Sequence, residues 1–254
     1  MWFISEIKTA FNNCRKGGCK YTLIIHMTLL LLFPLTGFSQ GEKENPYHLN
    51  LISTFTDYSN IVGKDSLQKL VDLEMVIPGI TLDIRYATSN NFTHQKVYNE
   101  AKAYLRLPAA KALASIEAEL KKQGLGLKVY DAYRPYAATM LFWEIVKDTL
   151  FVAAPWKGSR HNRGCAVDVS LIDLRTGKEL EMPTGFDDFT EKAGATYMKL
   201  PASAIENRNI LIREMQKHGF TVYPSEWWHY DFNGWDGYPL MDLSFEELLP
   251  ANQK

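Results

Sequence analysis

The sequence predicts an α+β fold, a single domain with a mainly antiparallel sheet flanked by helices. Segments with alternating apolar side chains, typical of strands, are mixed with segments that have apolar side chains at helical spacing. They do not follow the regular strand–helix–strand repeat of a parallel sheet. In addition, 46% of the 254 residues are hydrophobic and 13% are aromatic, so the chain can bury one large core.

The first 39 residues have the layout of a secretory signal peptide. Arg15, Lys16 and Lys20 precede an apolar run at 21–38, and small and polar residues follow it. A membrane anchor is the alternative, but a proline and a glycine interrupt the run, whose apolar length falls short of the ~20 residues of a membrane span. We therefore expect cleavage near Ser39 or Gln40 and an exported, periplasmic protein without a stable membrane anchor.

The mature part is predicted to have an extension and one folded domain. Residues 40–66 begin with a polar, irregular stretch and are interpreted as a linker or N-terminal extension, whereas residues 67–254 have a dense globular pattern. After the leader only Cys165 remains, so no internal disulfide can form. With 28 basic and 29 acidic residues, the chain lacks the basic excess of a nucleic-acid-binding protein. The oligomeric state does not follow from the sequence.

The expected strands share alternating apolar side chains and are, in chain order, residues 81–86, 125–131, 166–171, 220–223 and 228–232. The expected helices share apolar spacing of three and four residues and begin or end at proline or glycine. They are residues 108–123, residues 135–147 with Leu141, Trp143 and Ile145 as core candidates, and residues 205–218.

Two short segments carry the residues of a metal site. His161 and Asp168 lie on either side of a turn-prone stretch that includes Gly164, and Glu226 and His229 follow about sixty residues later. Two imidazoles and one carboxylate can hold zinc and leave a position open for water, and the second carboxylate can act as a general base. Taken singly, His161 would more often be a surface residue and His229 a core histidine. The four together favour metal-assisted hydrolysis.

These residues resemble the zinc D-alanyl-D-alanine peptidases, whose patterns are SxHxxGxAxD and ExxH. Every fixed position is matched, namely Ser159, His161, Gly164, Ala166, Asp168, Glu226 and His229. Within that family the chain is most similar to the D-alanyl-D-alanine dipeptidases of vancomycin resistance and cell-wall recycling, through further matches at 85–88, 91–93, 131–135, 186–187 and 226–230. The resemblance covers residues 67–243 and implies the fold shared by these peptidases and the hedgehog signalling domain.

The resemblance also implies a role for each matching residue. His161, Asp168 and His229 would bind one Zn²⁺ per chain, and Glu226 would be the catalytic base. Arg134 would be a catalytic residue that stabilises the oxyanion. The substrate-binding residues would be Asp187 and Tyr86 at the ammonium and Ser159 at the polar ends. A shift from Asp187 to Asp188, and a purely structural Tyr86, remain alternatives.

The predicted function is hydrolysis of the small dipeptide D-alanyl-D-alanine by an exported zinc dipeptidase, either in wall recycling or in glycopeptide resistance. One alternative is a peptidoglycan D,D-carboxypeptidase or endopeptidase of the same fold, which would accept longer substrates. The other is a zinc-stabilised binding domain without turnover, which the presence of Glu226 and Arg134 disfavours.

Overall fold

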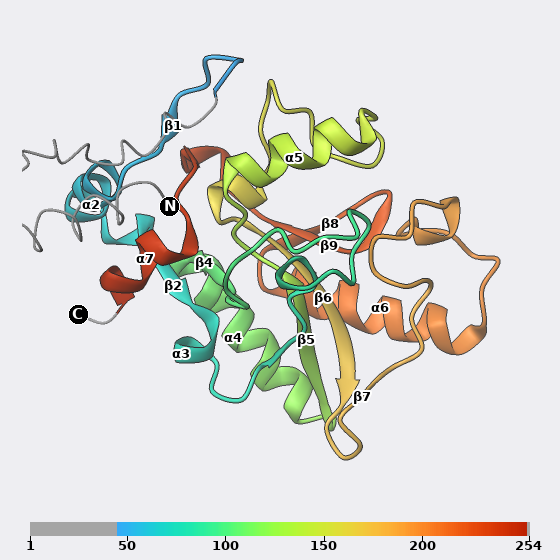
Figure 1. The fold of residues 1–254 in the computed structure, drawn as a ribbon. Coiled ribbons are helices and arrows are strands. Elements are labelled where there is room, and N and C mark those ends of the chain that lie inside the picture. The colour runs from blue at the N-terminus through green and yellow to red at the C-terminus, as the bar shows by residue number, and fades with distance from the viewer. Residues whose placement is uncertain (1–44, 253–254) are drawn as a thin grey trace, which may run out of the picture. The chain divides into compact units, whose positions relative to one another are not determined.

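The computed structural model describes residues 45–252 (Figure 1). The signal peptide predicted at 1–39 lies outside these residues. The central element is a sheet of six strands. Their order is β3 (Thr81–Leu82), β5 (Leu125–Asp131), β6 (Ala166–Asp173), β9 (Glu226–Phe232) and β8 (Phe220–Tyr223), with β7 (Lys178–Glu179) paired to the end of β6. Only β3 and β5 are parallel, so the predicted mainly antiparallel α+β fold is confirmed.

Two long helices cover one face of this sheet. Helix α4 (Leu107–Lys121) contacts β5, helix α6 (Ala202–Lys217) contacts β6, β8 and β9, and the two helices contact each other. The predicted core positions of α4 are all fully buried, namely Ala109, Leu113, Ile116 and Leu120. Facing them, β6 contributes Val167, Val169 and Leu171 to the core. Because side chains alternate along a strand, Asp168 points to the opposite face.

Helix α5 (Tyr136–Val146) lies apart from α4 and α6, beyond the end of β5 (Figure 1). Two of its three predicted core residues are wrong, whereas the half-buried Trp143 does pack against the core. Ile145 is 45% exposed, Leu141 and Trp143 are half-buried, and the buried face carries Tyr136, Thr139 and Phe142 instead. The helix is apolar almost all round, so hydrophobic spacing alone does not identify its inner face.

The strand expected at 81–86 is also shorter than predicted. After β3 the chain forms a 3₁₀ turn at Arg85–Ala87, and the carbonyl of Tyr86 accepts hydrogen bonds from the amides of both Val97 and Tyr98 at 2.8 Å. These bonds to a later segment of the chain replace the ladder of the sheet. The turn buries Tyr86, which is 2% exposed.

The segment before residue 66, interpreted as a linker or N-terminal extension, contains a strand and a helix in its described part. Strand β1 (Leu51–Ile52) pairs in parallel with β10 (Leu240–Met241), and helix α2 (Phe55–Lys64) follows it. Tyr58 of α2 is 2% exposed, and its hydroxyl accepts a hydrogen bond from the amide of Leu70 at 2.7 Å. This part of the extension is therefore packed into the domain.

The remaining strands and α-helices are a short strand pair and two helices. They are β2 (Leu70–Asp72), which pairs antiparallel with β4 (Tyr104–Arg106), and the helices α3 (Leu73–Val76) and α7 (Phe245–Asn252). Within residues 45–252, none of the helices combines the length and hydropathy that a membrane span needs.

Candidate active site

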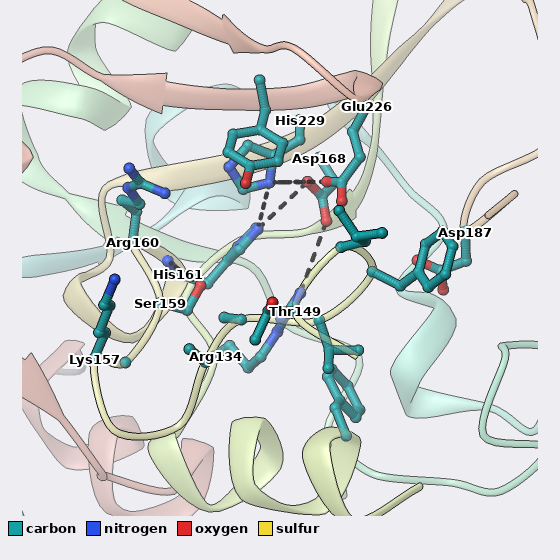
Figure 2. Close-up of a pocket in the computed structure, with 18 of the residues that line it drawn as sticks. Arg134, Thr149, Lys157, Ser159, Arg160, His161, Asp168, Asp187, Glu226 and His229 are labelled. Atoms are coloured by element: carbon teal, nitrogen blue, oxygen red, sulfur yellow. Dashed lines mark hydrogen bonds and ion pairs between the residues drawn. The ribbon is translucent and has the colours of Figure 1, made fainter. Parts of the chain in front are cut away.

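A pocket of about 520 Å³ opens at the end of the central sheet and collects every residue that the sequence predicted for the site (Figure 2). These residues are Tyr86, Arg134, Ser159, His161, Asp168, Asp187, Glu226 and His229. They come from segments up to 143 residues apart in the chain, from Tyr86 to His229. The fold therefore places them together.

The sheet register brings three of the acidic and basic groups into one row. Asp168 of β6 lies directly opposite His229 of β9, and residues directly opposite each other in an antiparallel pair point to the same face. On the other side, a register shift after Val129 of β5 places Asp131 opposite Asp168. In a regular register Asp131 would follow Val129 onto the helix-covered face. The irregularity turns it to the site instead.

His161 reaches this row from the turn before β6. The turn, at His161–Arg163, ends at Gly164, whose φ of 69° lies in the left-handed region. A Cβ at this position would lie 2.5 Å from Leu70 Cδ2, so a side chain would meet both backbone strain and a clash. Glycine is therefore required for the loop that brings His161 back to the sheet.

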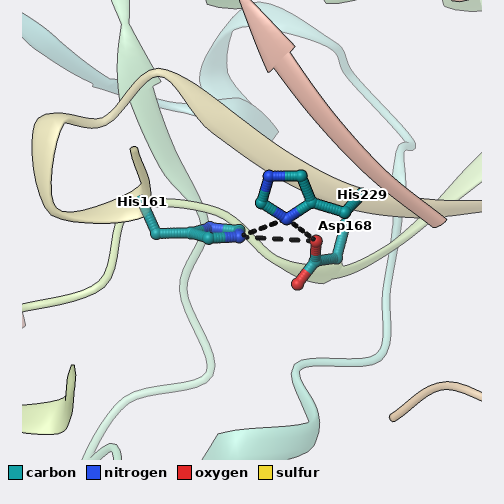
Figure 3. Close-up of side chains that lie close together, drawn as sticks. All are labelled: His161, Asp168 and His229. Atoms are coloured by element: carbon teal, nitrogen blue, oxygen red, sulfur yellow. Dashed lines mark hydrogen bonds and ion pairs between the residues drawn. The ribbon is translucent and has the colours of Figure 1, made fainter. Parts of the chain in front are cut away.

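The three predicted ligands converge (Figure 3). Their donor atoms lie within 4.8 Å of one another, and all three side chains are buried. His161 Nε2 lies 3.1 Å from His229 Nδ1, and Asp168 Oδ1 lies 3.1 Å from His229 Nδ1 and 3.4 Å from His161 Nε2.

The partners of the outer ring nitrogens fix how the imidazoles are protonated. His161 Nδ1 lies 2.6 Å from the carbonyl oxygen of Ala132, which can only accept, so this nitrogen carries the proton. His229 Nε2 lies 3.0 Å from Asp231 Oδ1, so it donates there. In neutral imidazoles, the inner nitrogens then present lone pairs to each other and to Asp168. Three acceptors facing one point need a cation between them, and the residues fit a metal ion.

The electrostatics of the group also favour a bound positive charge. Burial alone would raise the pKa of Asp168, but His161 and His229 outweigh it and hold that pKa well below its usual range. Burial lowers the pKa of His229, yet Asp168 and Asp231 together raise it well above its usual value. Either a proton or a metal ion satisfies this site.

Glu226 lies beside the group at the start of β9. Its Oε2 is 3.6 Å from His229 Nδ1. Residues three apart on a straight strand face opposite ways, but a second register shift, between β8 and β9, interrupts that alternation here. Tyr223 pairs with Glu226, whereas continuing the pairing of Val222 with Tyr230 would give His229. Burial, reinforced by the charge of Asp168, raises the pKa of Glu226.

Arg134 is held rigidly by Asp131. Its Nε and Nη2 both donate to Asp131 Oδ2, at 2.9 and 2.7 Å, and Nη2 lies 3.9 Å from Asp168 Oδ2. Asp131 in turn accepts hydrogen bonds from the hydroxyl of Tyr98 at 3.0 Å and the amide of Ala132 at 2.9 Å. The sequence analysis missed this role of Asp131, although it precedes Arg134 by three residues in a matched motif.

Asp187 rather than Asp188 faces the pocket. The hydroxyl of Tyr86 lies 3.1 and 3.0 Å from the two carboxylate oxygens of Asp187, whereas Asp188 accepts a hydrogen bond from the amide of Thr190 at 2.8 Å. Burial, and then the charge of Asp168, raise the pKa of Asp187 well above its usual value. An ammonium ion beside it would reverse that shift.

Ser159 lies at the pocket wall and is 7% exposed. Its hydroxyl accepts a hydrogen bond from the amide of His161 at 3.2 Å, and its amide donates to Asn162 Oδ1 at 2.7 Å. Asn162 also donates to the carbonyl of Arg134 at 2.9 Å, so it ties the histidine turn to the arginine segment. The sequence analysis did not identify this link.

Cys165 takes no part in the ligand group. It is fully buried, and burial raises the pKa of its thiol to about 12. The thiol is therefore protonated and unreactive at neutral pH.

The fold and the site together define a class, the metal-dependent hydrolases. Two imidazoles and a carboxylate converge with lone pairs, a second carboxylate stands beside them, and a fixed guanidinium faces the same cavity. The family model described as D-Ala-D-Ala dipeptidase matches residues 66–242, so the chain belongs to this family of peptidases.

Curated relatives agree with this assignment. The chain is 36% identical over 186 residues to the D-alanyl-D-alanine dipeptidase of Escherichia coli, which covers 73% of this chain and 96% of the relative. The dipeptidases of Enterococcus faecium and Streptomyces coelicolor are 28% and 30% identical, and each match covers 62% of this chain and 88% of the relative. The resemblance inferred from the motifs is confirmed, and the chain is a metallopeptidase.

Proposed function

We propose that this chain is a zinc dipeptidase that hydrolyses D-alanyl-D-alanine to two molecules of D-alanine. The observation that carries the proposal is the shared pocket. It combines three converging lone-pair donors, a neighbouring Glu226 and, at another wall, a half-buried Asp187 without an ion-pair partner among the residues described. The names of the relatives supply the identity of the dipeptide.

His161, Asp168 and His229 would hold the metal, and their chemistry favours zinc. Two imidazole nitrogens and one carboxylate oxygen, with an open position for water, are a common ligand set of catalytic zinc. When bound, zinc lowers the pKa of a water ligand toward ~7 and polarises a carbonyl group. Ala132 and Asp231 fix the orientation of the two imidazoles through their outer nitrogens.

Glu226 is placed to move the proton. A base must lie within reach of the attacking water, and Glu226 Oε2 is 3.6 Å from His229 Nδ1 at the edge of the ligand group. Its raised pKa brings the carboxylate nearer to the pH at which a group both takes and returns a proton. We assign to it the transfer of a proton from the water to the leaving amine.

Arg134 is placed to stabilise the oxyanion. Its guanidinium is buried on one side by Phe142, with 4.8 Å from Cζ to the ring centre, and is anchored by Asp131. A donor that is fixed before the reaction needs no rearrangement as charge develops. The remaining N–H groups of Arg134 are available to the substrate carbonyl oxygen.

Asp187 and Tyr86 favour a dipeptide over a longer peptide. A buried carboxylate pairs well with a free ammonium group. The first residue of a dipeptide carries such a group, whereas the penultimate residue of a wall peptide has an amide there. The D,D-carboxypeptidase alternative would leave the half-buried Asp187 without a cationic partner, which is costly.

Export and a role in cell-wall metabolism are part of the proposal. The basic residues followed by an apolar run at 21–38 support export to the periplasm. There the enzyme would degrade D-alanyl-D-alanine, either to recycle wall fragments or to confer glycopeptide resistance.

Hydrolysis of the two stereoisomers of dialanine tests the proposed function. Purified protein with one equivalent of zinc should release free alanine from D-alanyl-D-alanine and little from L-alanyl-L-alanine, as measured by chromatography of the products. Equal rates on both isomers, or hydrolysis of neither, would contradict it.

A further inference from the structure

We propose that Arg160 binds the carboxylate terminus of the substrate and so makes the pocket selective for a dipeptide with both charged ends. The inference rests on the proposed function. Asp187 would bind the ammonium end of the substrate, and the inference names the residue that binds the other end. Neither the motifs nor the comparisons singled out Arg160, which lies between Ser159 and His161 in the first motif.

Arg160 lies on the side of the pocket away from Asp187. In Figure 2, Arg160 and Lys157 stand to one side of the predicted ligands, and Asp187 stands to the other. Arg160 and Lys157 both line the pocket. The cavity therefore has an anionic end and a cationic end, and the ligand group lies between them.

Neighbouring side chains orient the guanidinium of Arg160 but leave part of its hydrogen-bonding capacity unused. Its Cζ lies 4.8 Å from the ring centre of Trp235 and 5.9 Å from that of Tyr223, so two aromatic rings position it. Its Nε lies 3.6 Å from Asp231 Oδ2. The two terminal nitrogens have no hydrogen-bond partner within residues 45–252, and the side chain is 38% exposed. A planar fork of this kind binds a carboxylate through two parallel hydrogen bonds.

Among the charged side chains nearby, Arg160 is the best suited to bind the substrate carboxylate. Asp231 offsets part of its charge, but Asp231 Oδ1 is already engaged with His229 Nε2 at 3.0 Å. Arg163, which also lies over the Trp235 ring at 5.4 Å, donates to the carbonyl of Tyr238. Lys157 is exposed and carries a point charge without the fork.

The charges at the two ends of the pocket are opposite to the charges at the two ends of the substrate. A dipeptide at neutral pH has an ammonium at one end and a carboxylate at the other, and two extended residues span at most about 7 Å. With the ammonium at Asp187, the peptide bond would lie at the ligand group and the carboxylate would point toward Arg160. A free carboxylate and a free amine are then recognised independently.

The test compares D-alanyl-D-alanine with its C-terminal amide, D-alanyl-D-alaninamide. The amide keeps the ammonium group for Asp187 but has no negative charge for Arg160. The zinc-loaded wild-type protein should prefer the acid. R160Q should lower kcat/KM for the acid by ~10- to 100-fold, the usual value of a hydrogen bond to a charged group, mostly through KM. It should leave kcat/KM for the amide nearly unchanged.

Two control variants and a zinc measurement distinguish a direct contact of Arg160 with the substrate from an indirect effect on the structure of the site. K157Q removes the same unit charge from the same rim, and it should change the ratio between acid and amide far less than R160Q does. R160K keeps the charge and should restore part of the preference for the acid. Zinc content, measured by elemental analysis, should stay at the wild-type value in R160Q, because a structural effect through Asp231 on His229 would lower it.

The outcomes distinguish this inference from the function on which it rests. An equal loss on acid and amide in R160Q, or the same selective loss in K157Q, would overturn the role of Arg160 and leave the dipeptidase intact. If the wild-type protein hydrolyses neither compound, the proposed function fails and the inference fails with it.

Discussion

Glu226→Gln should abolish most of the turnover of D-alanyl-D-alanine without removing the metal. The amide is nearly isosteric with the carboxylate but cannot take a proton from water, and a general base contributes typically ~100- to 10,000-fold. Steady-state kinetics should show the loss in kcat, whereas elemental analysis should show wild-type zinc content, because the converging donor atoms belong to His161, Asp168 and His229.

A matched variant at another carboxylate shows whether the loss is specific. Glu179 of β7 lies at the far end of β6, where it pairs with Lys128 at 3.1 Å, and it does not line the pocket. Glu179→Gln removes the same charge and should leave kcat close to the wild-type value. Loss of zinc from Glu226→Gln would make Glu226 a ligand, and near-normal turnover would exclude it as the base.

N-acetyl-D-alanyl-D-alanine should be a very poor substrate, cleaved ~10,000-fold less efficiently than the free dipeptide or worse. Acetylation removes the positive charge and leaves the half-buried Asp187 without its cationic partner. Sites built around a polar group reject analogues that lack it by roughly this factor. Burial and the charge of Asp168 already raise the pKa of Asp187, so the unpaired carboxylate is disfavoured in this pocket. Comparison of kcat/KM for the two compounds measures the effect.

The neighbouring Asp188 provides the control for this role. Asp187→Asn should strongly impair cleavage of the free dipeptide and reduce the discrimination against the acetylated one, whereas Asp188→Asn should do neither. Asp188 accepts a backbone hydrogen bond from Thr190 and does not line the pocket. If the acetylated dipeptide were cleaved as fast as the free one, the chain would be a carboxypeptidase or endopeptidase with its metal chemistry unchanged.

The elements with clear boundaries and one buried face were predictable from the sequence. The strand expected at 125–131 matches β5, since alternating apolar residues begin directly after Gly124. The inner face of α5 was not predictable, because apolar residues occur around the whole helix. The strand expected at 81–86 failed for another reason. The backbone after Leu82 forms hydrogen bonds with residues at 97–98, and the sequence pattern at 81–86 does not indicate these bonds.

The active site likewise has residues that were predictable from the sequence and residues that were not. His161, Asp168, Glu226 and His229 lie in short motifs with fixed spacing, so their positions could be read from the chain. The groups that orient them depend on tertiary structure. Asp131 faces the site only because of a register shift in β5, and the carbonyl of Ala132 acts through its backbone, which carries no residue-specific signal.

Zinc reconstitution tests whether His161, Asp168 and His229 form one zinc site on which hydrolysis depends. Protein freed of metal by a chelator should have no activity on D-alanyl-D-alanine. Activity should rise in proportion to added zinc and reach its maximum at one zinc per chain, whereas His161→Ala and His229→Ala should neither retain zinc nor regain activity. Turnover by the metal-free protein, or full zinc content in both histidine variants, would show that hydrolysis does not depend on this site.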